Sequence, residues 1–479
     1  MKQLNVAGKI RNCLICLFVF GLVVAFSVAE QRIVANLAAF PNPAGVIRTY
    51  NVNGDIDLTG SFFQSLGTNG RSCGSCHQPS DAMSVSAAHV QARFDESGGL
   101  DPIFRTNDGS NCDHDIDVST LAGRSAAYSL LRTRGLIRIA LEIPASRDFD
   151  VVRIQNPYGC NETHVISMYR RPLPATNLRF LTTVMFDGRE SSMQTGTTPI
   201  TFANSPESLL ADLSHQAIDA TVGHAQALTA PTVEQLSDIV NFEMGLSTAQ
   251  AQDNGVGSLR ARGATGGPQA LADELFFVGV NDPVGLNPHP ISFTSKIFNL
   301  FDTWEDASPR RRAIYRGETV FNTKTFSVSD VAGLNGATFS SGVTVAGTVV
   351  STTCGICHDT PNVGNHSVSA PLNIGVADAP GGRNVLDVRY LPVITICQRP
   401  ALTTCVNTTD PGRAMISGSF ADIGKFKGPI LRGLAARAPY FHNGSAHSLM
   451  DVVDFYDSRF NIGFTSQEKL DLVAFLNSL

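Results

Sequence analysis

The same motif, Cys-x-x-Cys-His, occurs twice in this chain of 479 residues, at positions 73–77 and 354–358. Such a motif is compatible with a redox-active dithiol, a pair of zinc ligands, chance, or covalent attachment of a c-type haem. With 10 Cys and 11 His in the whole chain, two chance matches are not expected. The fold must therefore build the same kind of site twice.

The first 29 residues have the pattern of a cleavable signal peptide. A basic start within residues 2–11 is followed by an apolar run over residues 13–28, which ends in a small-x-small pattern at residues 27–29. The run is short for a membrane-spanning helix, which needs about 20 apolar residues. We therefore predict export to the periplasm, with residues 1–29 excluded from the fold.

An oxidising compartment favours disulfides among the cysteines outside the two motifs. Four remain after the signal peptide: Cys112, Cys160, Cys397 and Cys405. We predict one disulfide between Cys397 and Cys405, which flank a short segment with hairpin character. A second is predicted between Cys112 and Cys160 in the first half of the chain. Other pairings of these four remain open from the sequence.

The motif cysteines fit haem c best. A zinc site needs four ligands close together, and no second Cys/His pair lies near either motif. A redox dithiol does not need the histidine, whereas covalent haem uses both thiols and the imidazole. The sequence therefore predicts two haem c groups, held by Cys73, Cys76 and His77 and by Cys354, Cys357 and His358.

Two similar helical patterns predict a mainly α fold made of two cytochrome-c-like haem domains in one chain. Thr232 with Gln235 and Thr465 with Glu468 form capping boxes, and apolar residues at helical spacing follow each pair. Each pattern comes after one motif. Helices are also expected before the motifs, at residues 60–66 and 308–322.

Loop and β-hairpin insertions are expected between these helices. The residues before the second motif alternate in the manner of a hairpin. The predicted organisation is residues 1–29 as signal peptide, 30–250 as N-terminal cytochrome-c-like domain with an insertion near 100–170, 251–305 as linker or surface segment, and 306–479 as C-terminal cytochrome-c-like domain. The formal net charge of −6 gives no basic footprint for nucleic acid.

Two further stretches resemble a known family. Residues 425–457, KFKGPILRGLAARAPYFHNGSAHSLMDVVDFYD, resemble the signature of bacterial di-haem cytochrome c peroxidases and the related MauG-type enzymes. Residues 186–200, FDGRESSMQTGTTPI, resemble the segment that this family places over its first haem. The resemblance implies that the N-terminal haem reacts with hydrogen peroxide and that the C-terminal haem passes electrons to it.

The resemblance also implies residues at the first haem. Arg189 and Gln194 are the expected polar groups there, and Pro199 or Ile200 takes the place of an iron ligand, which leaves the sixth position open. His89 and His224 are alternative ligands for that position in a resting state.

Two departures from the family pattern concern catalysis. Asn204 stands in the register of a family Glu, so Glu207, the nearest carboxylate, is the expected substitute in proton transfer. Phe186 stands where the family has a Trp between the haems.

At the second haem, Tyr456 occupies the register of the distal ligand, which is Met in the peroxidases and Tyr in the MauG-type enzymes. A packed core aromatic is the alternative role for Tyr456. Arg432, within the same signature, is expected to contact haem. The family also binds calcium between its haems, and Asn107 with the backbone of Arg437 and Pro439 matches that position loosely.

Two functions follow as hypotheses. The first is an exported di-haem oxidoreductase, either a peroxidase or a MauG-like enzyme that oxidises a partner. Its expected partners are a small electron-donor protein of the cytochrome c or cupredoxin type, or the oxidisable partner itself. The second is a non-catalytic di-haem electron carrier whose first haem is capped by His89 or His224.

Overall fold

The computed structural model describes residues 32–112, 116–160, 164–193, 201–202, 206–284, 289, 292–338, 344–345 and 347–479. The side chains of residues 201, 206 and 207 lie outside this description. The predicted signal peptide, Gln194, Pro199, Ile200 and Asn204 also lie outside the described residues.

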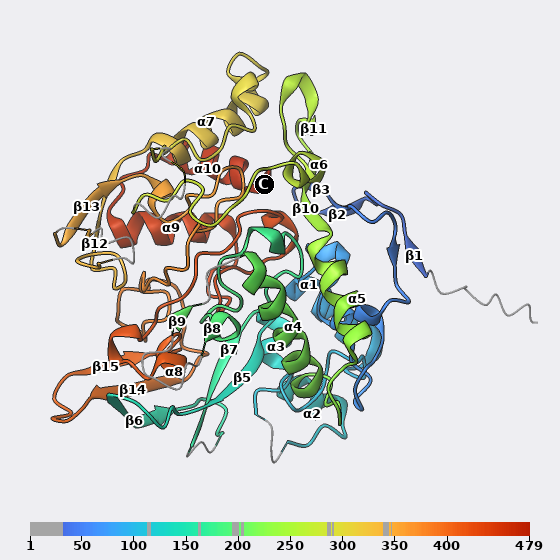
Figure 1. Ribbon diagram of the computed structural model, residues 1–479, viewed down its shortest axis with the longest axis vertical. Helices are drawn as coiled ribbons and strands as arrows, with labels where there is room; N and C mark the ends of the chain where they lie inside the picture. The colour runs from blue at the N-terminus through green and yellow to red at the C-terminus, as the bar shows by residue number, and fades with distance from the viewer. Residues whose placement is uncertain are drawn as a thin grey trace, which may run out of the picture.

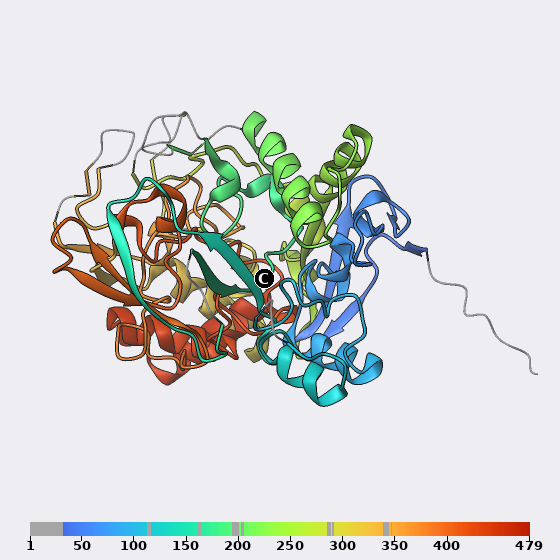
Figure 2. The ribbon, with the colours of Figure 1, turned by 90° about the horizontal axis from the view of Figure 1, so that it is seen from below.

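Two groups of α-helices stand apart from each other (Figures 1 and 2). Helices α7, α9 and α10 gather on one side of the molecule, and α4 and α5 gather on the other. The helices of the described residues are α1 (Ala87–Ser97), α2 (Leu121–Ala127), α3 (Ser129–Arg134), α4 (Pro206–Gly223), α5 (Val233–Met244), α6 (Pro268–Ala272), α7 (Pro309–Thr323), α8 (Ala414–Ser417), α9 (Leu449–Phe460) and α10 (Ser466–Asn477).

The strands pair antiparallel in several small sheets. One sheet has the order β11-β10-β3-β2, another has the order β15-β14-β6, and the pairs β1-β4, β5-β7, β8-β9 and β12-β13 stand alone. Their bounds are β1 (Ile33–Val34), β2 (Phe40–Asn42), β3 (Gly45–Asn51), β4 (Ile56–Asp57), β5 (Ile137–Glu142), β6 (Phe149–Gln155), β7 (Val165–Arg170), β8 (Ser192–Met193), β9 (Thr201–Phe202), β10 (Leu246–Asp253), β11 (Gly257–Ser258), β12 (Phe326–Ser329), β13 (Val349–Thr352), β14 (Val393–Gln398) and β15 (Cys405–Thr408).

The prediction of a mainly α fold is wrong. The described residues are 31% helical and 18% strand. Two long ladders join strands that are far apart in the sequence, β3 with β10 and β6 with β14, so no hairpin turn marks either pairing in the sequence. The expected helix at residues 60–66 is also only a 3-10 turn, Ser61–Phe63. A Cβ atom at Gly67, just beyond it, would lie 1.9 Å from the Ala225 carbonyl oxygen, so the chain passes too closely there for any other residue.

Helices α7, α9 and α10 pack around one aromatic core. Helix α10 begins with the predicted capping box and lies against α7, where a Cβ atom at Gly317 would be only 2.0 Å from the Asp471 carbonyl oxygen. Glycine is therefore required at this crossing. Phe475, fully buried, contacts the rings of Phe298 and Phe321. Residues 251–305 contribute to the same core, and the predicted division of the chain into domains stays a prediction.

The insertion near residues 100–170 connects the two halves. Its strand β6 pairs with β14, which also pairs with β15 in the predicted hairpin. Disulfides join Cys112 to Cys160 and Cys397 to Cys405, as predicted. The predicted hairpin before the second motif is confirmed by the pairing of β12 with β13. Among the described helices, none has the length and apolar character needed to cross a membrane.

Candidate haem-binding sites

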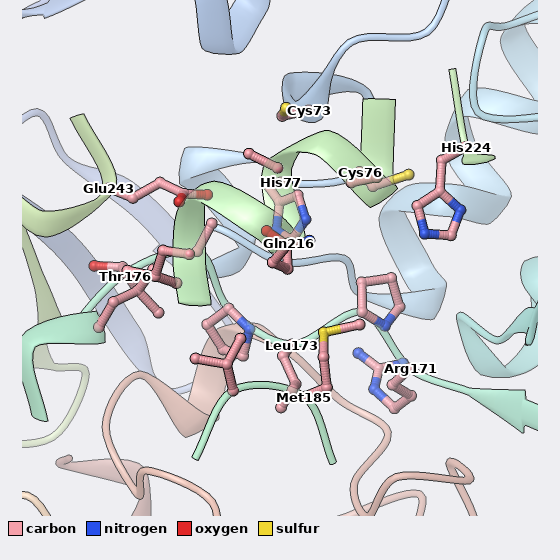
Figure 3. A pocket seen from close by; sticks show the side chains of 18 of the residues that line it. Cys73, Cys76, His77, Arg171, Leu173, Thr176, Met185, Gln216, His224 and Glu243 are labelled. Carbon is pink, nitrogen blue, oxygen red and sulfur yellow. The ribbon is translucent and has the colours of Figure 1, made fainter. Parts of the chain in front are cut away.

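The first motif lines an internal cavity of about 170 Å³. Cys73 begins a 3-10 turn, Cys73–Ser75, and this turn brings Cys73, Cys76 and His77 to the same cavity. Figure 3 shows His77 near the middle of this site, with Glu243 and His224 to either side. The Nδ1 atom of His77 lies 2.9 Å from the Met83 carbonyl oxygen. Because a carbonyl can only accept, Nδ1 carries the proton and Nε2 keeps a lone pair for a metal.

The second motif repeats this arrangement. A 3-10 turn, Cys354–Ile356, brings Cys354, Cys357 and His358 to a cavity of about 230 Å³. His358 Nδ1 lies 2.6 Å from the Gly364 carbonyl oxygen, which again leaves the Nε2 lone pair available. Protein interiors are close-packed, and a cavity of about 150 Å³ already takes up a benzene ring in a known case. Two cavities of this size, each beside a Cys-x-x-Cys-His motif, fit a bound prosthetic group.

The four motif cysteines form no disulfide. Burial raises the pKa of Cys73, Cys354 and Cys357 to about 12, and it also raises the pKa of Cys76. The thiolate is the reactive form of cysteine in disulfide exchange and in zinc binding, so both of those roles are disfavoured. Thioether bonds to a haem ring would consume the thiols and remove their charge.

The two cavities share a wall that holds three basic side chains. Arg171, Lys427 and Arg437 line both cavities, together with Phe186, the residue in the register of the family's Trp. Burial lowers the pKa of Lys427 to about 7 and the pKa of each arginine to about 10. Their hydrogen bonds go to carbonyl oxygens, such as that of Thr183 for Lys427 and that of Arg134 for Arg171.

Among the described residues, no carboxylate lines both cavities at this wall. In the same part of the chain, two guanidinium nitrogens of Arg432, which lines the first cavity, and one of Arg437 have no hydrogen-bond partner. Buried charges are costly unless paired. The propionate carboxylates of two haems would supply the missing partners, so the residues present fit the predicted cofactor.

His224 is brought to the first cavity, whereas His89 is not among the described residues that line it. The Nδ1 atom of His224 bonds the Asp108 carboxylate, and the other oxygen of Asp108 accepts from Arg71. A carboxylate behind an imidazole is the usual support for a metal-ligating histidine. The half-exposed His89 instead bonds Asp81 through Nδ1 at 2.6 Å.

Arg189 also lines the first cavity, where its guanidinium lies 3.2 Å from Asp187. Glu207 lies in the first turn of α4, but its side chain is outside the description, so its predicted role in proton transfer stays a prediction.

Glu243 at the first cavity was missed by the sequence reasoning. It is buried, and burial raises its pKa to about 8. Its Oε2 atom has no hydrogen-bond partner among the described residues. An acidic residue beside Phe242, on the apolar side of the α5 pattern, was the signal that could have identified it.

Tyr456 on α9 lines the second cavity together with His358. Burial raises the pKa of Tyr456, and its hydroxyl makes no hydrogen bond within the described part of the chain. This placement is compatible with the predicted iron ligation. His442 of the signature lines the same cavity and stacks on Phe426 with ring centroids 4.0 Å apart.

The predicted calcium ligands differ in their contacts, and the Oδ1 atom of Asn107, which would face the ion, is buried without a hydrogen-bond partner among the described residues. The Asn107 amide donates to the Gly223 carbonyl at 3.0 Å, and the Arg437 carbonyl accepts from the Arg171 guanidinium at 2.8 Å. Pro439 lines the second cavity. The calcium site stays a prediction.

No protein-family model matches the chain. It is 40% identical over 81 residues to cytochrome-c peroxidase IdrP1 of Pseudomonas sp. (strain SCT), a match to 15% of this chain and 21% of that protein. It is 34% identical over 137 residues to cytochrome-c peroxidase IdrP2 of Denitromonas iodatirespirans, a match to 26% of this chain and 35% of that protein. The chain thus spans about a third or less of the length of these relatives.

One solved structure, that of a MauG-like protein associated with microbial copper homeostasis, aligns with 88% of this chain and 87% of its own. The identity is 16% and the TM-score is 0.34, which is too low to support an argument.

Proposed function

Since the chain is related to bacterial cytochrome-c peroxidases, we propose that it is an exported di-haem c oxidoreductase that reacts with peroxide at its N-terminal site. The observation that supports this most is the pair of cavities, each lined by a Cys-x-x-Cys-His motif whose histidine is oriented for metal ligation. The wall shared by the two cavities supports electron exchange between them.

Haem c, when bound, supplies the iron that accepts peroxide at one site and stores electrons at the other. The chain's own residues attach and orient the two groups. The Met83 and Gly364 carbonyls hold the rings of His77 and His358 in place. Arg171, Lys427 and Arg437 offset the negative charge of the propionates.

We assign proton exchange in the first cavity to Glu243. A carboxyl group with a pKa of about 8 is mostly protonated at neutral pH, so it can give a proton and then take one back. Replacing Glu243 by Gln keeps its shape and removes this ability. General acid–base catalysis contributes roughly 100- to 10,000-fold to a rate. The rate of peroxide consumption should therefore decrease by a factor in that range. Glu234→Gln, on the first and exposed turn of the same helix, is the matched control.

Tyr456 as the distal ligand of the second iron would tilt the activity towards oxidation of a partner. A phenolate is a hard anionic donor that stabilises oxidised iron and lowers its potential. A low-potential second site is a poor acceptor for ordinary electron-donor proteins but can share oxidising equivalents with the first. We therefore propose an oxidisable partner over a cytochrome c or cupredoxin donor.

The test is ligand binding to the purified holoprotein, followed in the visible spectrum. One of the two haems should bind cyanide or carbon monoxide and react with peroxide, at least after partial reduction. The proposal fails if both irons remain low-spin and inert in every redox state.

His224 supports a second candidate function, a di-haem electron carrier. Its carboxylate-backed ring lies at the first cavity, where it is suited to fill the sixth position. His224→Ala distinguishes the two functions. If the first haem binds carbon monoxide only in this variant, the electron carrier is favoured. If the unchanged protein binds it as well, the enzyme is favoured.

A further inference from the structure

A buried cluster of metal-ligand side chains lies beside the second haem site. Asp282, Asp359 and His366 are 4%, 0% and 6% exposed, and one ligand atom from each lies within 4.8 Å of the others. These atoms are close enough together to surround a single ion. The other such cluster in the described part of the chain, Glu190, His215 and Asp219, is largely exposed.

The backbone holds the cluster in place. Gly279 N donates to the Ser367 carbonyl at 2.8 Å, and the Asn281 amide donates to the Asp359 carbonyl at 3.0 Å. Two separate segments, residues 279–282 and 359–367, are thereby joined. Asp359 Oδ1 accepts the Ser367 amide at 2.6 Å, which leaves Oδ2 to face the cluster.

Several side-chain atoms at this cluster lack hydrogen-bond partners among the described residues. Asp359 Oδ2 and His366 Nε2 are buried without a hydrogen bond within the described residues, and they lie 3.4 Å apart. The hydroxyl of Thr360, fully buried, also lacks a hydrogen-bond partner there. Asp359 forms no ion pair with Lys or Arg within the same part of the chain. Buried polar groups are almost always satisfied, so a cluster of orphaned atoms indicates a missing ligand.

We propose that Asp282, Asp359 and His366 bind a divalent metal ion of the Zn²⁺ or Mn²⁺ class. Carboxylates and a neutral imidazole together suit these ions, whereas Ca²⁺ and Mg²⁺ take oxygen ligands. The ion compensates the buried carboxylates and uses the free lone pair of His366. The site is separate from the predicted calcium ligands and does not depend on the proposed activity.

The position of the ion gives it an effect on the second haem. Asp359 directly follows His358, and Gly364, whose carbonyl orients the His358 ring, lies between the two ligands Asp359 and His366. A bound ion ties both ends of this loop together. Its removal loosens the hydrogen bond to His358 Nδ1 and shifts the redox potential of the second haem, while the first haem keeps its potential.

The experiment starts from the purified holoprotein, with haem iron as the internal standard for metal analysis. After dialysis against a chelator, Zn²⁺, Mn²⁺ and Ca²⁺ are titrated separately by calorimetry, and the potential of each haem is measured with and without Zn²⁺. We expect one Zn²⁺ or Mn²⁺ per chain, tighter binding of these ions than of Ca²⁺, and a Zn²⁺-dependent potential at the second haem only.

Asp282→Asn is the decisive variant, because Asp282 neither neighbours a haem-attachment residue nor lines the second cavity. Loss of the hydrogen-bond partner behind a metal ligand costs roughly 10- to 100-fold in affinity, and loss of the ligand itself should weaken Zn²⁺ binding by at least that much. Asp219→Asn, in the exposed cluster, is the matched control and should leave Zn²⁺ binding unchanged.

The proposal is overturned if the chelated wild-type protein binds neither Zn²⁺ nor Mn²⁺, or if Asp282→Asn binds Zn²⁺ as tightly as the wild type. Preferential binding of Ca²⁺ overturns the assignment of the ion. The wild-type titration decides the question even if the variant does not fold.

Discussion

Asp187→Asn tests whether a buried ion network holds the segment that contains Asp187 and Arg189 at the first site. Arg170, at the end of β7, donates to Asp187 and makes two hydrogen bonds to Asp410, with donor–acceptor distances of 2.7 and 2.9 Å. All three side chains are at most 3% exposed. Asp187 also accepts from the backbone of Arg189 at 3.1 Å. The network thus ties the Arg189 segment to the second half of the chain.

The stability cost of Asp187→Asn follows from the burial of its ion pair with Arg170. Removing one partner of a buried ion pair costs about 3–5 kcal/mol when the other charge is left unpaired. Arg170 keeps its two hydrogen bonds to Asp410 in this variant, so the cost should lie at the lower end, about 3 kcal/mol. Unfolding entropy is about 2.1 cal/mol/K per residue, or roughly 1 kcal/mol/K for a chain of this length. The variant should therefore lower Tm by about 3 °C if unfolding is cooperative.

The effect should depend on pH in a defined direction. Burial opposes ionisation of Asp187, but the charges of Arg170 and Arg189 outweigh it and hold the pKa of Asp187 well below its ordinary value. A carboxylate with a depressed pKa stabilises the fold fully above its unfolded pKa, near 3.9, and loses this contribution as pH falls further. The Tm difference between wild type and variant should be constant from about pH 5 to 8 and should shrink below pH 4.

The assay is thermal unfolding of the holoprotein, followed by circular dichroism across this pH range. Asp150→Asn, which removes the exposed ion pair with Arg399, is the matched control and should hardly change Tm. A variant Tm within 1 °C of the wild type at pH 7 would refute the reasoning about the buried network.

Three further predictions concern the cofactors and the core. Pyridine haemochrome titration should give two covalent haems per chain, and a value of one would contradict the doubled site. Tyr456→Phe should raise the potential of the second haem in potentiometry and change its resonance Raman spectrum, whereas unchanged signals would exclude ligation. Phe475→Ala should lower the free energy of unfolding by about 3–5 kcal/mol, because its buried ring contacts three aromatic rings; a loss below 1 kcal/mol would show that the core repacks.

Local features were predictable from the sequence. The capping boxes of α5 and α10 and the pairing of Cys397 with Cys405 depend on residues close together in the chain, and the structure confirms them. The resemblance to cytochrome-c peroxidases is supported over part of the chain, since segments of 81 and 137 residues match proteins of that name. The positions of Tyr456 and Phe186 at the cavities agree with the register of those motifs, while the roles of both residues stay predictions.

Features that depend on tertiary contacts were not predictable. The strand content was underestimated because β3 and β10, at opposite ends of the predicted N-terminal haem domain, pair with each other and no turn between them marks the pairing. The buried state of Lys427 cannot be read from its neighbours, since lysine is ordinarily a surface residue. The support of His224 by Asp108 joins residues more than a hundred positions apart, so the sequence left His89 and His224 as equal candidates.

The pairing of β6 with β14 also constrains how the chain can be cut and how it folds. β14 is the middle strand of its sheet and carries Ile394 and Ile396, which are fully buried. A fragment beginning near residue 306 would lack β6 and would present β14 as an open edge, prone to pairing with other chains. During synthesis, β6 must wait for the second half before it gains its partner. The two halves are therefore not expected to survive as separately expressed proteins, and co-expressed fragments divided between β6 and β14 should recover solubility only together.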